Sequence, residues 1–402
     1  MQATSSRRNF LKLCATAHSA GNALSEQWQR QQNEAQRLKF TLAKEIKGAF
    51  YRAISPDSQK LCIGFMRKPI GKITITSQGS QRDVHYQASA GFTLVVLGVG
   101  DWREIYSVER PGMPGAISFF LDGEALYASS STFQPITEHL LVLDLRTGGM
   151  EQREWAFDGR TSADYYALWE RVLIGVRGQS TQRPHLVQVR WPDLTELVGI
   201  PLEGWAGGPR MTVDRKKLIH PVGQRLVCRR AEDFDVLWTR QVDPEIDLKA
   251  RMKWNDPEKA PHLSSTAYAV SADGSTVALA PQGTTSEQAP RRFYTEILDG
   301  ESGAPRARWP LDFGDGIVLS PDGKLLALAE VADDRSGQLE PTAHIYAVPS
   351  GTEVTRVVHD QVPRNQRLNA SLSEGMEFTP DGRYFITSAN NKVKIWKVGQ
   401  EP

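Results

Sequence analysis

This sequence of 402 residues has few cysteines, no long apolar run and no excess of charge of either sign. Its three cysteines are too few for a disulfide framework; Cys62 and Cys228 lie in apolar strand patterns and are expected to be core thiols, whereas Cys14 lies near the amino terminus. The longest uncharged apolar stretch, residues 91–100, is far shorter than the ~20 residues of a membrane-spanning helix. The 48 basic and 47 acidic residues leave a net charge of +1, so no global field attracts nucleic acid or an anionic membrane. We therefore expect a soluble mature protein with no nucleic-acid partner and no membrane span.

The sequence also lacks the short motifs that mark common active sites. It contains no G-x-S-x-G, no G-x-x-x-x-G-K-[ST], no G-x-G-x-x-G and no H-E-x-x-H. Its eight histidines are scattered, although metal ligands can converge from distant segments. The pair Asp333-Asp334 is expected to be a solvated acidic loop rather than a cation site. We therefore predict no catalytic set, no metal site and no cofactor.

The amino terminus carries a pattern typical of export. Residues 6–12 read SRRNFLK and resemble the twin-arginine signal at every position of S-R-R-x-F-L-K, with Arg7, Arg8, Phe10 and Leu11 at its defining positions. A signal also needs an apolar stretch and small residues for cleavage, and here 13–24 is only weakly apolar. We expect residues 1–24 to be a signal segment and the protein to be periplasmic or secreted. The alternative is a frayed basic terminus on a cytoplasmic protein. Residues 25–37, rich in Gln and Glu, predict a short helical or disordered linker.

One hairpin form recurs through the chain, with a β-rich run, a tight polar turn and a second β-rich run. Its turn aspartates are Asp57, Asp122, Asp214, Asp273, Asp322 and Asp381. Pro presets φ, Asp bonds to the backbone two residues on, and Gly accepts positive φ, so all three suit such a turn. The 92-residue gap after Asp122 holds a degenerate copy, YYALWERVLIGV from Tyr165, with Trp169-Glu170 at its turn. The chain therefore contains seven such hairpins.

A second hairpin follows most of the first ones, as in LLVLDLRTGGMEQREWAF from Leu140. Seven units of four strands, each roughly 40 to 50 residues long, predict a β-propeller. SPDGKLLALA from Ser320 and TPDGRYFITSANNKVKIWKV from Thr379 resemble WD40-type blades, and the wider set resembles the bacterial WD40-like or YVTN propellers. The resemblance implies an all-β, seven-bladed propeller of four-stranded antiparallel blades over residues 38–398, with 399–402 as a tail.

This resemblance is incomplete in two respects. The Trp-Asp ending appears only as Trp396 followed by Lys397, and no Gly-His pair precedes a blade, so the His/Asp/Ser/Trp network of such blades is not mapped here. The seventh blade ends after three strands, which would leave an edge ready to pair with another chain. Leu38–Lys44 alternates apolar and polar residues. We expect it to pair beside Lys392–Val398 and to close the ring as the missing outer strand.

Strands A to D of each blade are taken from the axis outward, so the short A-to-B and C-to-D turns share one face. Nearly every insertion falls on the other, loop-rich face, and loops on a rigid scaffold commonly carry binding residues. Its candidate partner-binding residues are Trp205, Trp254, Arg291, Arg292, Arg364 and Arg367. Tryptophan is common at interfaces but also anchors loops, and surface arginines are often merely solvated, so these roles stay as alternatives.

These features favour a non-enzymatic scaffold, a monomeric propeller whose loop-rich face binds another protein or a small ligand. The competing prediction is a periplasmic propeller enzyme, either a metal-dependent hydrolase or lactonase, or the subunit of a dehydrogenase. Its residues would meet at the mouth of the central channel, and no spacing in the sequence identifies them.

Overall fold

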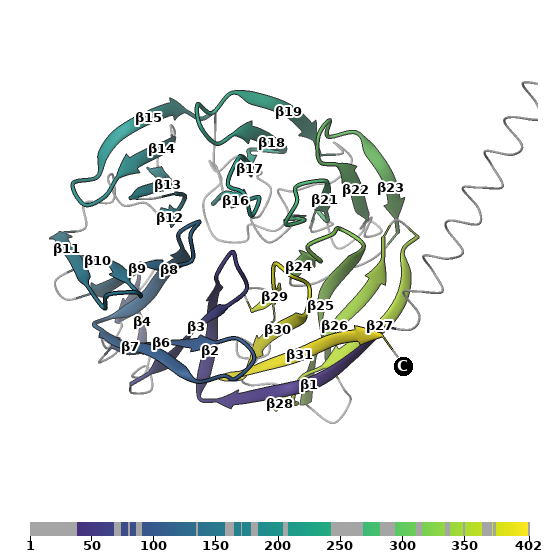
Figure 1. Ribbon diagram of the computed structural model, residues 1–402, viewed down its shortest axis with the longest axis horizontal. Helices are drawn as coiled ribbons and strands as arrows, with labels where there is room; N and C mark the ends of the chain where they lie inside the picture. The colour runs from purple at the N-terminus through teal and green to yellow at the C-terminus, as the bar shows by residue number, and fades with distance from the viewer. Residues whose placement is uncertain are drawn as a thin grey trace, which may run out of the picture.

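The computed structural model shows seven antiparallel sheets arranged in a ring around a central axis (Figure 1). It describes residues 38–67, 74–78, 81–85, 91–133, 136–156, 165–169, 171–177, 184–203, 208–242, 268–281, 294–310, 316–333, 338–348, 350–363, 372 and 375–400. Each sheet has four strands in order from the axis to the rim, and the sixth gains a short fifth strand. The predicted all-β, seven-bladed β-propeller is confirmed. The expected signal segment 1–24 and linker 25–37 lie outside the described residues.

The blades are numbered in chain order, and their strands follow from A to D. Blades 1 to 3 are β2 (Ala49–Ile54), β3 (Lys60–Met66), β6 (Phe92–Gly98) and β7 (Glu104–Arg110); β8 (Met113–Phe119), β9 (Ala125–Phe133), β10 (Ile136–Asp144) and β11 (Met150–Ala156); and β12 (Tyr165–Ala167), β13 (Val172–Arg177), β14 (His185–Arg190) and β15 (Thr195–Pro201). Blades 4 to 6 are β16 (Arg210–Met211), β17 (Lys217–Val222), β18 (Arg225–Arg230) and β19 (Val236–Gln241); β20 (Tyr268–Val270), β21 (Thr276–Leu279), β22 (Thr295–Asp299) and β23 (Pro305–Trp309); and β24 (Gly316–Leu319), β25 (Leu325–Asp333), β26 (Gln338–Ala347) and β27 (Thr352–Val358). Blade 7 is β29 (Met376–Phe378), β30 (Tyr384–Ala389), β31 (Lys392–Gln400) and β1 (Leu38–Lys47).

Two connections carry paired strands of their own. A hairpin of β4 (Thr74–Gln78) and β5 (Gln81–His85) lies between β3 and β6 of blade 1. Asp333, which was expected in an acidic loop, is instead the last residue of β25, because β25 and β26 form a longer hairpin and β28 (Val362–Pro363) pairs with β26. This longer hairpin buries Leu339 against Val362, which explains why the chain stays paired there. The predicted tail is also shorter, since β31 runs to Gln400.

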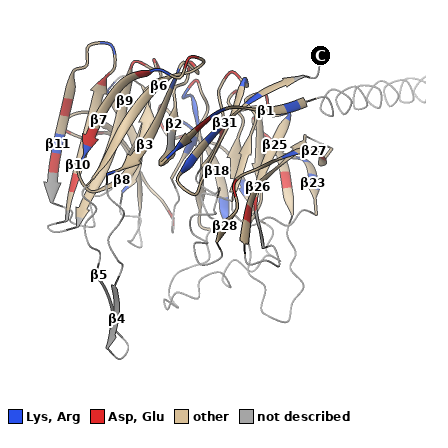
Figure 2. Ribbon diagram, turned by 90° about the horizontal axis from the view of Figure 1, so that it is seen from below, with Lys and Arg blue, Asp and Glu red and all other residues tan. Residues whose placement is uncertain are grey.

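The ring is closed by the two ends of the propeller, as the alternation in Leu38–Lys44 predicts. Strand β1 pairs antiparallel with β31 from Leu38 opposite Gln400 to Lys47 opposite Lys392, and the two strands lie side by side in Figures 1 and 2. The Phe40 ring meets Phe385 edge-on with centroids 5.8 Å apart, and it also contacts the Phe378 ring. The amino-terminal strand therefore supplies both the D strand of blade 7 and part of the core between blades 6 and 7.

Most of the outer strands carry a β-bulge, which hinders pairing with other chains. In five blades the D strand carries a β-bulge near the turn that precedes it, with one extra residue in the ladder: Ile105, Leu197, Leu237, Arg306 and Val354. A bulge bends an edge strand and disrupts its free ladder. The bulges also explain several exposed apolar side chains, because Ile105, Leu197 and Leu237 are each the extra residue of a bulge.

Neighbouring blades are joined by an aromatic ring packed on a glycine turn. The Trp238 ring of blade 4 lies so close to Gly303 of blade 5 that a Cβ there would come within 2.7 Å of it, and Trp309 of blade 5 meets Gly351 of blade 6 in the same way. The Trp238 Nε1–H also donates to Gly300 O at 3.0 Å. These turns need glycine both for positive φ and for the closeness of the ring.

Replacing Gly303 with alanine is expected to lower the free energy of unfolding by about 3 kcal/mol, from the left-handed backbone and the clash with Trp238 together. Gly223 is the matched control, because its φ is +58° and a Cβ there meets no atom within 4 Å. Gly223→Ala should lose only about 1 kcal/mol. Urea unfolding of both variants measures the difference. Equal losses in the free energy of unfolding would show that the contact with the Trp238 ring does not contribute to stability.

Candidate functional site

The sequence-predicted contact residues all lie outside the part of the chain that the structure describes. This applies to Trp205, Trp254, Arg291, Arg292, Arg364 and Arg367, and also to the export residues Arg7, Arg8, Phe10 and Leu11. Their placement stays a prediction. The described residues instead define the opposite face, built from the A-to-B and C-to-D turns, which we call the turn face; these short turns gather on one side of the ring (Figure 2).

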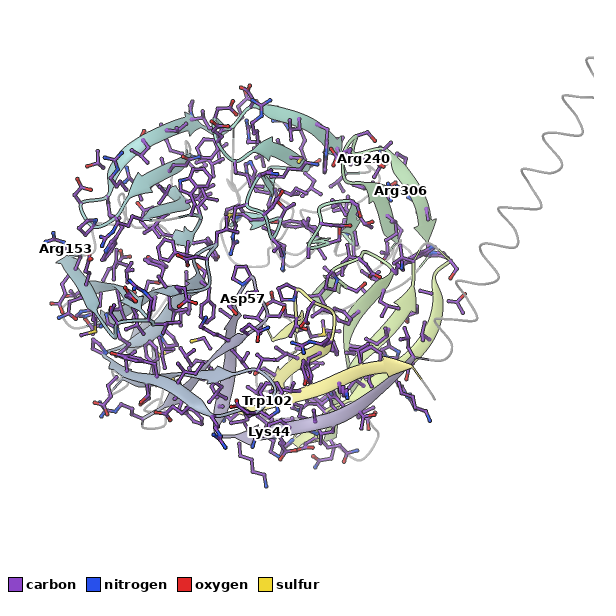
Figure 3. The ribbon with its side chains drawn as sticks, in the orientation of Figure 1. Lys44, Asp57, Trp102, Arg153, Arg240 and Arg306 are labelled. Atoms are coloured by element: carbon purple, nitrogen blue, oxygen red, sulfur yellow. The ribbon has the colours of Figure 1, made fainter. Side chains whose placement is uncertain are left out.

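Five of the A-to-B turns repeat one hydrogen-bonded network. In blade 4, the Thr212 hydroxyl donates to the Asp214 carboxylate at 2.6 Å, and the carboxylate accepts the Lys216 N–H at 3.0 Å. Partial burial raises the pKa of Asp214, but these hydrogen bonds outweigh it and lower the pKa on balance. Equivalent networks centre on Asp57, Asp273, Asp322 and Asp381. These carboxylates are committed to holding the turns rigid, and Figure 3 shows Asp57 beside the axis.

The residue after each turn aspartate, or after its counterpart Glu170 in blade 3, adopts a left-handed backbone in all seven blades, and in four of them it is glycine. The three exceptions are Ser58, Arg171 and Arg215, with φ of 60°, 53° and 58°. A left-handed residue with a side chain costs about 1–2 kcal/mol. Each exception makes a contact to another blade: Ser58 Oγ accepts the Asp381 N–H at 2.9 Å, and Arg171 holds Glu151 through two hydrogen bonds. The side chains at this position therefore serve contacts between blades.

The residue before each of these turn acids is apolar in every blade. The seven residues are Pro56, Leu121, Trp169, Val213, Ala272, Pro321 and Pro380, and we call them the apolar collar. Leu121 is 38% exposed and the other six are half-buried, so all of them keep contact with water. Neighbouring turns touch, because the Val213 N–H donates to Ala272 O at 2.9 Å and Gly382 lies against Pro321. The innermost turns thus form one apolar ring around the axis.

Arg215 extends from its turn in blade 4 to blade 2. Its Nη2 donates to Phe119 O at 3.2 Å, and this is the one hydrogen bond that its side chain makes to a described residue. Its Nε is buried and has no hydrogen-bond partner in the part of the chain that the structure describes. Arg215 connects blade 4 to blade 2, and blade 3 lies between them. The guanidinium therefore lies within the ring of inner turns.

The charge of Arg215 is held in a low-dielectric setting. Burial lowers the pKa of its guanidinium to about 10, and Glu377 on β29 of blade 7 opposes this shift. The side chain therefore stays cationic at pH 7. A guanidinium has five N–H donors, so most of those on Arg215 are unused by the described residues. This combination of a desolvated cation, spare donors and a surrounding apolar ring is the candidate binding site.

One other buried charge has a structural partner across the seam between blades 4 and 5. Glu296 of blade 5 is only 3% exposed and accepts two hydrogen bonds from Arg240 of blade 4, at 2.7 and 3.0 Å. Arg240 lies at the rim in Figure 3, far from the axis. Breaking a buried pair of this kind leaves an uncompensated charge, so its main effect is on stability. Among the described residues, no group of three or more His, Cys, Asp or Glu side chains is placed to hold a metal ion.

In blade 7, Trp396 Nε1–H donates to Thr387 Oγ1 at 2.9 Å. His359, which follows β27, lies beside the backbone of Thr387. Cys62 and Cys228 are buried thiols, as predicted.

The ring of seven four-stranded blades defines the protein as a seven-bladed β-propeller. A chain in the solved structure titled "Crystal Structure of Mitotic Checkpoint Complex" is similar to it, with a TM-score of 0.52 and 13% sequence identity over 90% of this chain and 93% of that one. At this identity the likeness shows the fold alone. No family model and no curated protein sequence matches the chain. The described residues include no helix of the length and apolarity needed to span a membrane.

Proposed function

We propose that this protein is a non-enzymatic scaffold that binds another protein through its propeller. The apolar collar carries this proposal, because seven blades place an apolar residue at the same partly exposed turn position around the axis. Contiguous apolar surface on a rigid frame is stabilised when a partner covers it, by about 25 cal/mol for each Å² buried.

The test uses a pair of leucines of nearly equal exposure. Leu121 of the collar is 38% exposed and Leu237 of the rim bulge is 40% exposed, so aspartate at either position should leave the folded core intact. Partners are captured by cross-linking in host cells and identified by mass spectrometry. Leu121→Asp should reduce the recovery of the main partner at least tenfold, whereas Leu237→Asp should not. Equal recovery with Leu121→Asp and the unaltered protein would contradict the collar as the contact surface.

The loop-rich face stays a second proposed contact surface, on the strength of its insertions. Trp205 and Trp254 are its proposed anchors, and Arg291, Arg292, Arg364 and Arg367 its proposed anion contacts. The double variant Trp205→Ala/Trp254→Ala is examined by the same cross-linking. Loss of the partner there, with full recovery from Leu121→Asp, would assign the contact to the loop-rich face.

We also propose export by the twin-arginine route, on the pattern at residues 6–12. Replacing both Arg7 and Arg8 with lysine should abolish transport of a fused reporter, because the signal depends on the arginine pair. Unchanged transport of the lysine variant would exclude this route, and a reporter found inside the cell with the native signal would exclude export.

A further inference from the structure

We propose that the mouth of the axis on the turn face binds a carboxylate carried by an apolar stretch of a partner polypeptide, with the carboxylate on Arg215 and the neighbouring apolar side chains on the collar. This inference rests on the proposed function and specifies the chemistry of the partner. It concerns a surface and residues that the sequence patterns did not single out.

The donors of Arg215 are the first observation. The buried Nε has no partner in the described part of the chain, and a single neutral carbonyl, Phe119 O, accepts from Nη2. A guanidinium presents its donors as a planar fork that matches a carboxylate. An incoming carboxylate would supply the charged acceptor that the fork lacks.

The backbone of Arg215 is the second observation. Four blades have glycine at this left-handed position, and glycine would relieve the strain there. Ser58 and Arg171 use the same position for firm contacts with other blades: Ser58 accepts a backbone N–H, and Arg171 holds a carboxylate with two hydrogen bonds. The Arg215 side chain makes one hydrogen bond, although its backbone is strained and its charge is desolvated. Its own contacts within the fold therefore account for its presence poorly, whereas an anionic ligand accounts for it well.

The surroundings of Arg215 decide what kind of carboxylate fits. The collar offers Leu121, Trp169 and Val213 in the blades nearest to its path, and these side chains favour apolar neighbours on the ligand. The charge of Glu377 in blade 7 also acts on Arg215, and the same carboxylate repels a second anionic group. The site thus favours one carboxylate flanked by apolar residues over a polyanion such as a nucleic acid.

The experiment uses the full-length protein and an array of octapeptides of random sequence, printed once with free carboxyl termini and once as terminal amides. Peptides that bind should carry one carboxylate next to at least two apolar residues. Loss of binding in the amide set identifies the chain end as the source, and retention identifies an Asp or Glu side chain. The failure of every peptide to bind would overturn the proposal.

Arg215→Gly is the informative variant, because glycine already occupies this position in four blades and the fold should be retained. It should weaken the bound peptides at least tenfold in fluorescence anisotropy. Lys216→Gln removes the same charge from the adjacent exposed residue, which pairs with Asp214 at 3.5 Å, and should leave binding unchanged. Equal affinity of Arg215→Gly and the unaltered protein would overturn the proposal. If Leu121→Asp still lost its cellular partner in that case, the scaffold function would stand and only the carboxylate site would be rejected.

Discussion

Deleting residues 38–47 should abolish the cooperative unfolding of the entire propeller. The deletion removes the outer strand of blade 7 and exposes the edge of β31 along its length. It also removes Phe40, whose ring packs on Phe378 and Phe385, and Ile46, which packs against the core shared with blade 1. Truncation of a single large core side chain costs about 3 kcal/mol, so loss of the strand exceeds the usual stability margin of a domain.

Thermal unfolding followed by circular dichroism, together with gel filtration, measures this effect. The expected result is a broad or absent transition and self-associated protein, because the open edge pairs with other copies. A chain lacking only residues 1–37 keeps β1 and is the matched control. Addition of a synthetic peptide with the sequence LKFTLAKEIK should restore part of the transition. A deletion variant that melts within about 2 °C of the unaltered protein would show that the ring does not depend on this closure.

Stability should fall steeply as the pH drops from about 6.5 towards 4, because two buried histidines stay neutral in the fold. His220 is fully buried, and burial and the Arg229 charge lower its pKa to about 3. His359 is 4% exposed, and burial and Lys394 lower its pKa to about 4. Unfolded histidine takes up its proton near pH 6.5, so below that value the unfolded chain binds more protons than the folded one. Each histidine then contributes a slope of about 1.4 kcal/mol for each pH unit.

Urea unfolding at intervals between pH 7 and pH 4 gives this slope directly. Near pH 5 the two histidines together should remove about 3 kcal/mol for each pH unit. His359→Gln should remove about half of the slope, whereas the same replacement at His185, which is exposed on β14, is the control. Asp360 lies outside this window, because hydrogen bonds from Lys392 and Lys394 lower its pKa to about 2 and its contribution is lost only below about pH 4. A stability that is flat from pH 6.5 to 4.5 would contradict the neutral buried state of both histidines.

The architecture could be read from the sequence because its signals are local. The turn at Asp322-Gly323 and the alternation on either side of it specify a hairpin without help from distant residues. The same holds for the degenerate unit around Trp169 and for the alternating segment from Leu38. The place of that segment as the closing strand follows from the seventh blade, which has only three strands of its own. Strand ends were less certain, as the continuation of β25 to Asp333 shows, because pairing there depends on Val362 beyond the next strand.

The candidate site could not be read in the same way. The apolar collar was visible in principle as a fixed turn position, but only the ring places its seven members around one axis. Arg215 gives a weak local signal, a bulky residue where other blades have glycine, and its meaning depends on Phe119 of blade 2 and Glu377 of blade 7. The long connections with Trp205 and Trp254 have no periodic pattern of apolar residues. Their sequence therefore predicts only that they lie on the loop-rich face, and it specifies no contact.

Amide hydrogen exchange of the propeller, alone and in complex with its cross-linked partner, tests the central claim most directly. The account predicts that partner binding slows exchange at residues 121–124, 169–171 and 213–216, where the inner turns surround the axis. Slower exchange confined to residues 178–183 and 282–293, which the sequence predicts to lie on the loop-rich face, would contradict it.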